Sequence, residues 1–159
     1  MATRLTPEDT RQSLAAHVAA KGVELREKYG PHIGWAELLR ILEDRAFVRY
    51  PCQVVFAAES LLDGEFAHAA PNGERPEDGF TLHVHPFYHA QLHQVPLLVL
   101  YHLVTINYGQ FASAEDAETF GAAALGLTRD EYYHALCRMA DQLPAPAENT
   151  TANPGDGCC

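Results

Sequence analysis

Hydrophobic positions recur at helical spacing through the first 45 residues of the chain. Thr6 is suited to cap a helix and Pro7 to occupy its first position, and the apolar stripe that follows predicts a helix over residues 7–29. A second helix is predicted to begin around residues 34–35 and to end near Arg45. The apolar positions that define the two stripes are Leu14, Val18 and Leu25 in the first helix and Leu38, Leu39 and Leu42 in the second.

The pattern then changes to short segments rich in β-branched and aromatic residues. Residues 52–56 and 80–86 are predicted strands, and Pro86 is expected to end the second one. Residues 60–79 are predicted to form one long loop, because glycine and proline recur through them. A loop of that length inside a compact domain is more often functional than not.

The second half of the chain is predicted to be helical. Nearly every position in residues 95–108 is apolar, which indicates a helix that its neighbours cover on all sides. Two further helices are predicted over residues 113–126 and 128–143, with Ser113 and Thr128 as N-caps and an acidic residue three positions after each.

Together these elements predict an α+β fold. We expect a single domain over residues 1–143, with several helices packed on a small β-sheet and the apolar helix 95–108 buried at the centre. A chain of 159 residues is long enough to bury a core without a disulfide or a metal. Residues 144–159 contain mainly Pro, Asn, Thr and Gly and are predicted to form a disordered C-terminal tail.

Charge is divided unevenly along the chain. The whole sequence holds 11 basic and 21 acidic residues, a formal net charge of −10. Residues 1–50 carry 8 basic and 7 acidic side chains, whereas residues 51–159 carry 3 basic and 14 acidic ones. Because a nucleic-acid-binding protein needs a basic surface, we expect no nucleic-acid partner. A protein partner or a homo-oligomer remains open.

The sequence also favours a cytoplasmic protein. The first 15 residues lack the apolar run of a secretory signal. The longest apolar stretch, residues 95–106, is shorter than the ~20 residues that a membrane span requires, so no membrane partner is expected. In a reducing compartment Cys52 and Cys137 are expected to be buried free thiols.

Histidine is the residue type that points to chemistry. Six of the 9 histidines lie within residues 68–102, and His83 and His85 are expected to share one face of a strand. Imidazole is the commonest transition-metal ligand, and a predicted binding loop beside the strand carries carboxylates. We therefore consider a site for zinc or a similar divalent metal, with solvent-exposed histidines as the alternative. The candidate ligands are His68, His83, His85, His102 and Glu65, and the candidate binding-loop residues are Glu59, Asp63, Glu65 and His68.

His102 differs from the other histidines because the helix around it is predicted to be buried. A buried imidazole needs a hydrogen-bond partner, which Thr105 or a polar group of the sheet is placed to supply. A satisfied core histidine is thus the structural alternative to a metal ligand at this position.

The stretch from His102 to Gly109, His-Leu-Val-Thr-Ile-Asn-Tyr-Gly, resembles the central helix of zinc-metallopeptidase-like (zincin) domains. Those domains carry H-E-x-x-H, often followed by x-x-G, in which two histidines bind zinc and the glutamate activates water. Here Leu103 stands at the glutamate position and Ile106 at the second histidine position. The resemblance covers about residues 80–127.

A second zincin segment, E-x-x-A-x-x-F-A, supplies the third metal ligand in some bacterial members. Residues 114–121 keep its alanine and phenylalanine but have Ala114 at the ligand position. The resemblance therefore implies a degenerate zincin-like scaffold without zincin chemistry, in which only His102 carries over.

Three functions remain open from the sequence. The first is a non-catalytic binding or scaffold protein, favoured because no complete catalytic set is found. The second is a metal-binding protein or metal-dependent hydrolase that uses the histidines of residues 68–102. The third is a small-molecule-binding domain with its pocket between the 60–79 loop and the sheet. The distribution of histidines and acidic residues directs all three away from the first two helices.

Overall fold

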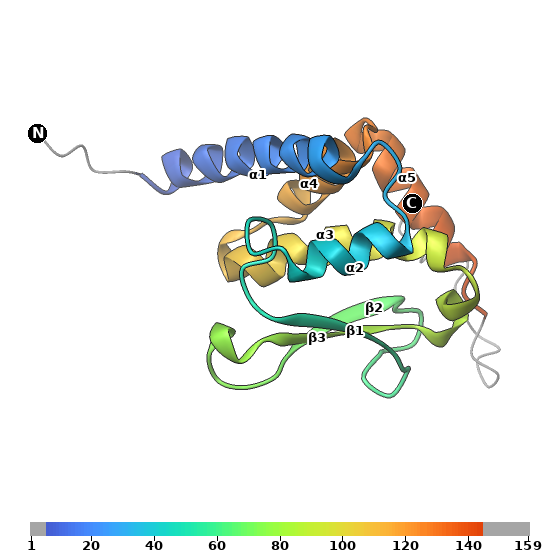
Figure 1. Ribbon diagram of the computed structural model, residues 1–159. Coiled ribbons are helices and arrows are strands. Elements are labelled where there is room, and N and C mark those ends of the chain that lie inside the picture. The colour runs from blue at the N-terminus through green and yellow to red at the C-terminus, as the bar shows by residue number, and fades with distance from the viewer. Residues whose placement is uncertain (1–5, 145–159) are drawn as a thin grey trace, which may run out of the picture.

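The computed structural model describes residues 6–144, apart from the side chains of residues 7–11. Within this range five α-helices and a three-stranded sheet form the α+β fold that the sequence predicts (Figure 1). The helices are α1 (Pro7–Tyr29), α2 (Trp35–Glu43), α3 (Val95–Tyr108), α4 (Ala114–Leu125) and α5 (Arg129–Asp141). The strands are β1 (Cys52–Phe56), β2 (Ala67–Pro71) and β3 (Phe80–Val84). The predicted tail, residues 144–159, lies outside the described residues except for Pro144.

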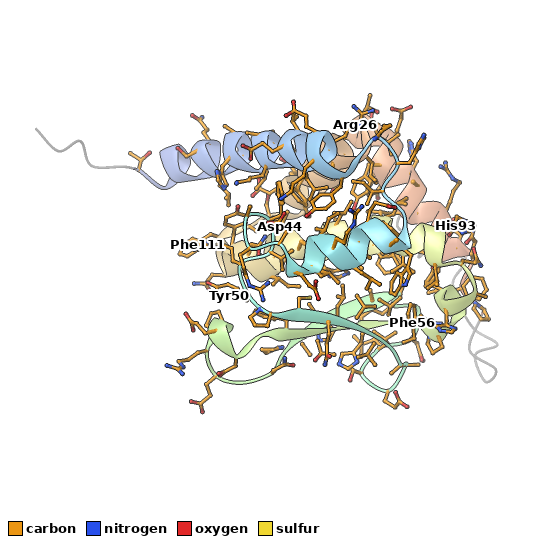
Figure 2. The ribbon with its side chains drawn as sticks, in the orientation of Figure 1. Arg26, Asp44, Tyr50, Phe56, His93 and Phe111 are labelled. Carbon is orange, nitrogen blue, oxygen red and sulfur yellow. The ribbon has the colours of Figure 1, made fainter. Side chains whose placement is uncertain are left out.

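The molecule is built in three layers. The sheet forms one layer, α2 and α3 lie over one of its faces, and α1 with α4 lies beyond them (Figure 1). Side chains fill the space between the layers (Figure 2). None of the helices within residues 6–144 is both long enough and apolar enough to cross a membrane.

The sheet shows one error of the sequence analysis. Its strand order is β1-β3-β2, with β1 parallel and β2 antiparallel to β3. The prediction of one long loop over residues 60–79 is wrong, since β2 lies within it. The segment Ala-His-Ala-Ala-Pro has neither the β-branched residues nor the alternation that indicate a strand, and its pairing with β3 is what makes it one.

The two faces of the sheet differ in what covers them. Leu82 and Val84 of β3 are 0% exposed and belong to the hydrophobic core. Thr81 and His83 alternate with them and therefore lie on the opposite face, away from the helices. The sheet is thus buried on one side only.

Helix α3 lies at the centre of the fold, as predicted. It is covered by α4 and α5 on one side and by β2 and α2 on the other. Its mean hydropathy is high along its whole length, and only Thr105 among its residues is exposed. Tyr132 of α5, which is fully buried, fixes one end by donating a hydrogen bond to the carbonyl of Leu97.

Two glycines allow helices to approach closely. A Cβ atom on Gly22 of α1 would lie 2.6 Å from the Cβ of Ala123 in α4. A Cβ atom on Gly121 of α4 would lie 2.2 Å from the ring of Tyr132 in α5. These distances are well inside van der Waals contact, so both helix pairs require glycine at the crossing.

The helix starts were predicted better than the helix ends. Ser113 and Thr128 accept hydrogen bonds from the backbone N–H of Asp116 and Glu131, which confirms both capping boxes. Helix α2 ends at Glu43 and α5 at Asp141, each two residues before the predicted end. Asp44 ends α2 because its backbone is extended.

Candidate functional site

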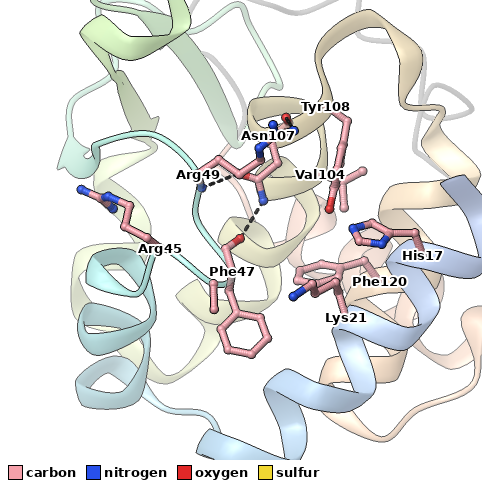
Figure 3. Close-up of a pocket in the computed structure, with 10 residues that line it drawn as sticks. His17, Lys21, Arg45, Phe47, Arg49, Val104, Asn107, Tyr108 and Phe120 are labelled. Atoms are coloured by element: carbon pink, nitrogen blue, oxygen red, sulfur yellow. Dashed lines mark hydrogen bonds between the residues drawn. The ribbon is translucent and has the colours of Figure 1, made fainter.

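A cavity of about 350 Å³ opens where α1, the connection between α2 and β1, α3 and α4 meet (Figure 3). We call residues 44–51 the α2–β1 connection. The cavity takes its cations from residues 1–50, whereas the histidines and acidic residues predicted a site in residues 51–159. Its lining residues are His17 and Lys21 of α1, Arg45, Ala46, Phe47 and Arg49 of the connection, Val104, Asn107 and Tyr108 of α3, and Phe120 of α4.

The cavity is cationic although the protein is strongly acidic. Lys21, Arg45 and Arg49 line it together with His17, and none of the described lining residues is acidic. The chain as a whole has a formal net charge of −10. A local concentration of positive charge on an acidic protein gives a potential that favours an anion at this one place.

Arg49 is held at the cavity by α3. Its Nη1 donates a hydrogen bond to the backbone carbonyl of Asn107 at 3.2 Å. Its guanidinium carbon lies 5.8 Å from the ring centroid of Tyr108 and 5.8 Å from that of Tyr50. These contacts fix a side chain that is otherwise exposed, and no ion pair with a described carboxylate neutralises it.

Asn107 of α3 holds the backbone of the connection. It is only 7% exposed. Its Oδ1 accepts a hydrogen bond from the Arg49 backbone N–H at 2.9 Å, and its Nδ2 donates to the Phe47 carbonyl at 2.7 Å (Figure 3). One amide side chain therefore positions both the cation and the aromatic ring that the connection contributes.

Asp44 holds the other end of the connection, where it follows α2 (Figure 2). Its carboxylate accepts hydrogen bonds from Lys28 Nζ at 2.6 Å, from Tyr29 Oη at 2.7 Å and from the backbone N–H of Ala46 at 2.9 Å. The hydrogen bond from Lys28, followed by that from Tyr29, lowers the pKa of Asp44 to about 2. The connection is thus anchored at both ends and forms a fixed wall.

Lys21 and His17 form the opposite wall, on α1. The Lys21 ammonium lies 5.5 Å from the centroid of the Phe47 ring and 3.3 Å from a carboxylate oxygen of Glu24. The His17 ring meets the Tyr108 ring edge-on at a centroid distance of 5.6 Å. Burial raises the pKa of Tyr108 against the opposing charge of Arg49, so its phenol keeps its proton and can donate a hydrogen bond.

Arg45 contributes least of the three cations to the positive charge that faces the cavity. Its Nη1 donates to the carbonyls of Leu42 and Val48 at 3.3 and 3.4 Å. Figure 3 shows its guanidinium turned away from the other labelled side chains. Lys21 and Arg49 are therefore the cations that face the cavity from its two walls.

The histidines predicted as metal ligands are only partly brought together. The register of β2 and β3 places His68 directly opposite His83. His85 lies one residue beyond the end of β3, where its backbone N–H still donates to the Phe66 carbonyl. Its Nδ1 caps a 3-10 turn by accepting a hydrogen bond from the backbone N–H of Phe87.

Among the carboxylates of the predicted binding loop, Asp63 lines a cavity of about 260 Å³ together with His85. Glu65 accepts a hydrogen bond from the backbone N–H of Leu62, and Glu59 and Asp63 are exposed. Within residues 6–144 no group of three or more His, Cys, Asp or Glu side chains is placed to hold a metal ion. The metal hypothesis therefore gains no ligand set from the described residues.

His102 is half-buried, and within residues 6–144 its Nε2 lacks the partner that its position on α3 predicts. Its Nε2 is buried and has no hydrogen-bond partner among the described residues, and Thr105 is exposed to solvent. Burial, with a smaller contribution from the charge of His68, lowers the pKa of His102 to about 4. The imidazole is therefore neutral at physiological pH.

The two cysteines in the described range differ. Cys52 is a free thiol, as expected, and burial raises its pKa to about 11, which makes it a poor nucleophile at neutral pH. Cys137 is disulfide-bonded, so the expectation of a second free thiol is wrong.

The sequence analysis did not find the cationic cavity. Its walls come from four segments that are far apart in the chain, and no fixed spacing relates Lys21, Arg49 and Phe120. One signal was available, because 8 of the 11 basic residues lie in residues 1–50. That bias placed the cations in the correct segment but did not show which of them face one another.

Comparisons of the chain with protein-family models, with curated proteins and with solved structures find no match. Nothing therefore bears on the resemblance to zincin domains, which stays a prediction. The function has to be argued from the cavity itself.

Proposed function

We propose that this protein reversibly binds a small organic anion in the cavity between α1 and the α2–β1 connection. The anionic group would lie between Lys21 and Arg49, and the apolar part of the ligand would contact the half-buried ring of Tyr108. The observation that carries the proposal is a cavity lined by cations, with no described acidic residue, in a chain of net charge −10.

Preorganisation supports binding at this place. Asp44 and Asn107 fix the two ends of the α2–β1 connection through hydrogen bonds of 2.6–2.9 Å. A site whose walls are already ordered loses little conformational entropy when a ligand enters. The cations therefore need not be collected from disordered segments at the moment of binding.

The proposal belongs to the binding class of functions rather than to catalysis. The described lining contains neither a carboxylate, a serine nor a cysteine that would serve as nucleophile or as partner for His17. It also differs in place from the small-molecule pocket predicted beside residues 60–79, because it lies on the other side of α3. The degenerate zincin-like scaffold is not needed for it.

Isothermal titration calorimetry of the full chain tests the proposal. The probes are benzoate, phenyl phosphate and neutral benzyl alcohol, each titrated at low ionic strength. We expect saturable binding of at least one anion, no binding of benzyl alcohol, and weaker binding as salt is added. Charge-assisted hydrogen bonds contribute about 1.5–3 kcal/mol, so Lys21→Gln and Arg49→Gln should each weaken binding roughly tenfold or more.

Arg138→Gln is the matched control, because Arg138 is exposed on α5 and does not line the cavity. It removes one positive charge from the protein and should leave the affinity within twofold of the unmodified chain. The proposal is contradicted if no anion binds saturably, or if all three variants bind with the same affinity.

A further inference from the structure

The cavity carries information on the class of anion, and the argument rests on the proposed function. Apart from its cations, the lining includes His17, Ala46, Asn107 and the ring of Tyr108. It also includes Phe47, Val104 and Phe120, which are no more than 7% exposed. Its volume of about 350 Å³ lies near the lower end of the roughly 300–1,000 Å³ typical of small-molecule sites. A space of this size and lining suits one apolar ring rather than a nucleotide or a lipid chain.

The positive charge available to a ligand is limited. Lys21 already shares its charge with Glu24, whose carboxylate oxygen lies 3.3 Å away. Arg45 donates to two backbone carbonyls of the chain. Arg49 is thus the main cation of the site, and one anionic charge matches it better than the two of a phosphate dianion.

The shape of the Arg49 donor set points to an anion that presents two oxygens side by side, and the limited positive charge favours a carboxylate over a phosphate. Only Nη1 of this guanidinium donates to a described group, the Asn107 carbonyl. The remaining N–H groups lie in one plane and form the fork that pairs with both oxygens of a carboxylate. Contacts with the rings of Tyr50 and Tyr108, each with its centroid 5.8 Å from the guanidinium carbon, restrict the movement of the side chain.

We infer that the ligand is a single-ring aromatic monocarboxylate. Its carboxylate is bound by the free edge of Arg49 and by Lys21, and its ring lies against the half-buried ring of Tyr108. The cavity selects the ligand by the distance between its carboxylate and its ring. This distance is fixed because Arg49 and the residues of α3 lie on different elements that Asn107 holds together.

Competition between four probes tests this inference: benzoate, acetate, cyclohexanecarboxylate and phenyl phosphate, each measured by calorimetry on the full chain. Benzoate is expected to bind at least tenfold more tightly than acetate, and more tightly than phenyl phosphate. Benzoate should also bind more tightly than cyclohexanecarboxylate, and Tyr108→Leu should reduce that preference.

Arg49→Lys separates a planar fork from a simple positive charge. It keeps the charge but loses the fork, so it should weaken benzoate binding at least fivefold, whereas a site that needs the charge alone would lose less than twofold. Circular dichroism of each variant confirms that it is folded, and Arg138→Lys is the matched control.

The outcomes distinguish the inference from the proposed function. If acetate or phenyl phosphate binds as tightly as benzoate, and Arg49→Gln still weakens that binding, the inference is wrong and the anion site stands. A benzoate affinity that stays within twofold in Arg49→Lys also overturns the inference. If no anion binds, both are wrong.

Discussion

Asn107 offers the sharpest test of how the cavity is held together. Its side chain is 7% exposed and makes two hydrogen bonds to the α2–β1 connection, to the Phe47 carbonyl and to the Arg49 backbone N–H. Asn107→Ala removes both bonds at once. It leaves the carbonyl of Phe47 buried without a partner, whereas the N–H of Arg49 is only partly buried and water can reach it.

The expected loss of stability follows from these two groups. An unsatisfied buried polar group costs about 1–3 kcal/mol, and the partly buried one falls at the low end of that range. We therefore expect Asn107→Ala to lower the free energy of unfolding by about 3 kcal/mol. In a domain of this size that corresponds to a fall in Tm of roughly 6–12 °C.

Urea unfolding followed by circular dichroism measures this change. Asn72→Ala is the control, because Asn72 is exposed and its loss should cost less than about 1 kcal/mol. Asn107→Asp keeps the acceptor for Arg49 but places a carboxylate oxygen against the Phe47 carbonyl, so it should destabilise at least as much as alanine. Surface substitutions change the free energy of unfolding by no more than about 0.5 kcal/mol. If Asn107→Ala changes it by no more than that, Asn107 does not hold the α2–β1 connection in place.

Two further predictions concern the core. The pKa of His102 is lowered to about 4 from an ordinary value of 6.5, so the unfolded chain binds a proton at this residue more readily than the folded one. The contribution of neutral His102 to the free energy of unfolding is therefore fully present above pH 6.5. It falls by about 3 kcal/mol as the pH drops towards 4. The free energy of unfolding, measured between pH 7 and 4.5, tests this. It should depend less on pH in His102→Leu than in the unmodified chain, whereas the exposed control His32→Leu should keep the pH dependence of the unmodified chain. Gly121→Ala places a methyl group against the ring of Tyr132 and should cost about 1–3 kcal/mol in urea unfolding, whereas the exposed Ala114→Gly control should cost no more than about 1 kcal/mol; equal stability of both would disprove the close packing of α4 and α5.

Local signals in the sequence were sufficient for the helices. Caps at Ser113 and Thr128 and the apolar run of residues 95–108 depend on neighbours within one or two turns, so they can be recognised without knowledge of the fold. Strand β2 could not be recognised in this way. Its alanines and proline carry no β preference, and β3 supplies the hydrogen bonds that stabilise it.

The candidate site was predictable only in part, for a related physical reason. Crowding of histidines in the sequence indicated a cluster, and the pairing of β2 with β3 is what places His68 opposite His83. It could not predict a ligand set, since Glu65 bonds to its own turn and His102 lies on a helix. The cationic cavity depends on the packing of α1 against α4 and on Asn107, which are contacts between distant parts of the chain.

The location of a bound anion shows whether the cavity between α1 and the α2–β1 connection is the binding site. Two-dimensional ¹H–¹⁵N NMR of the full chain, titrated with benzoate, reports which backbone amides change. The account predicts saturable shifts in residues 17–21, 45–49 and 104–108, and none around His68 and His83 on the open face of the sheet. Saturable shifts confined to another region, or no saturable shift at millimolar benzoate, would contradict it.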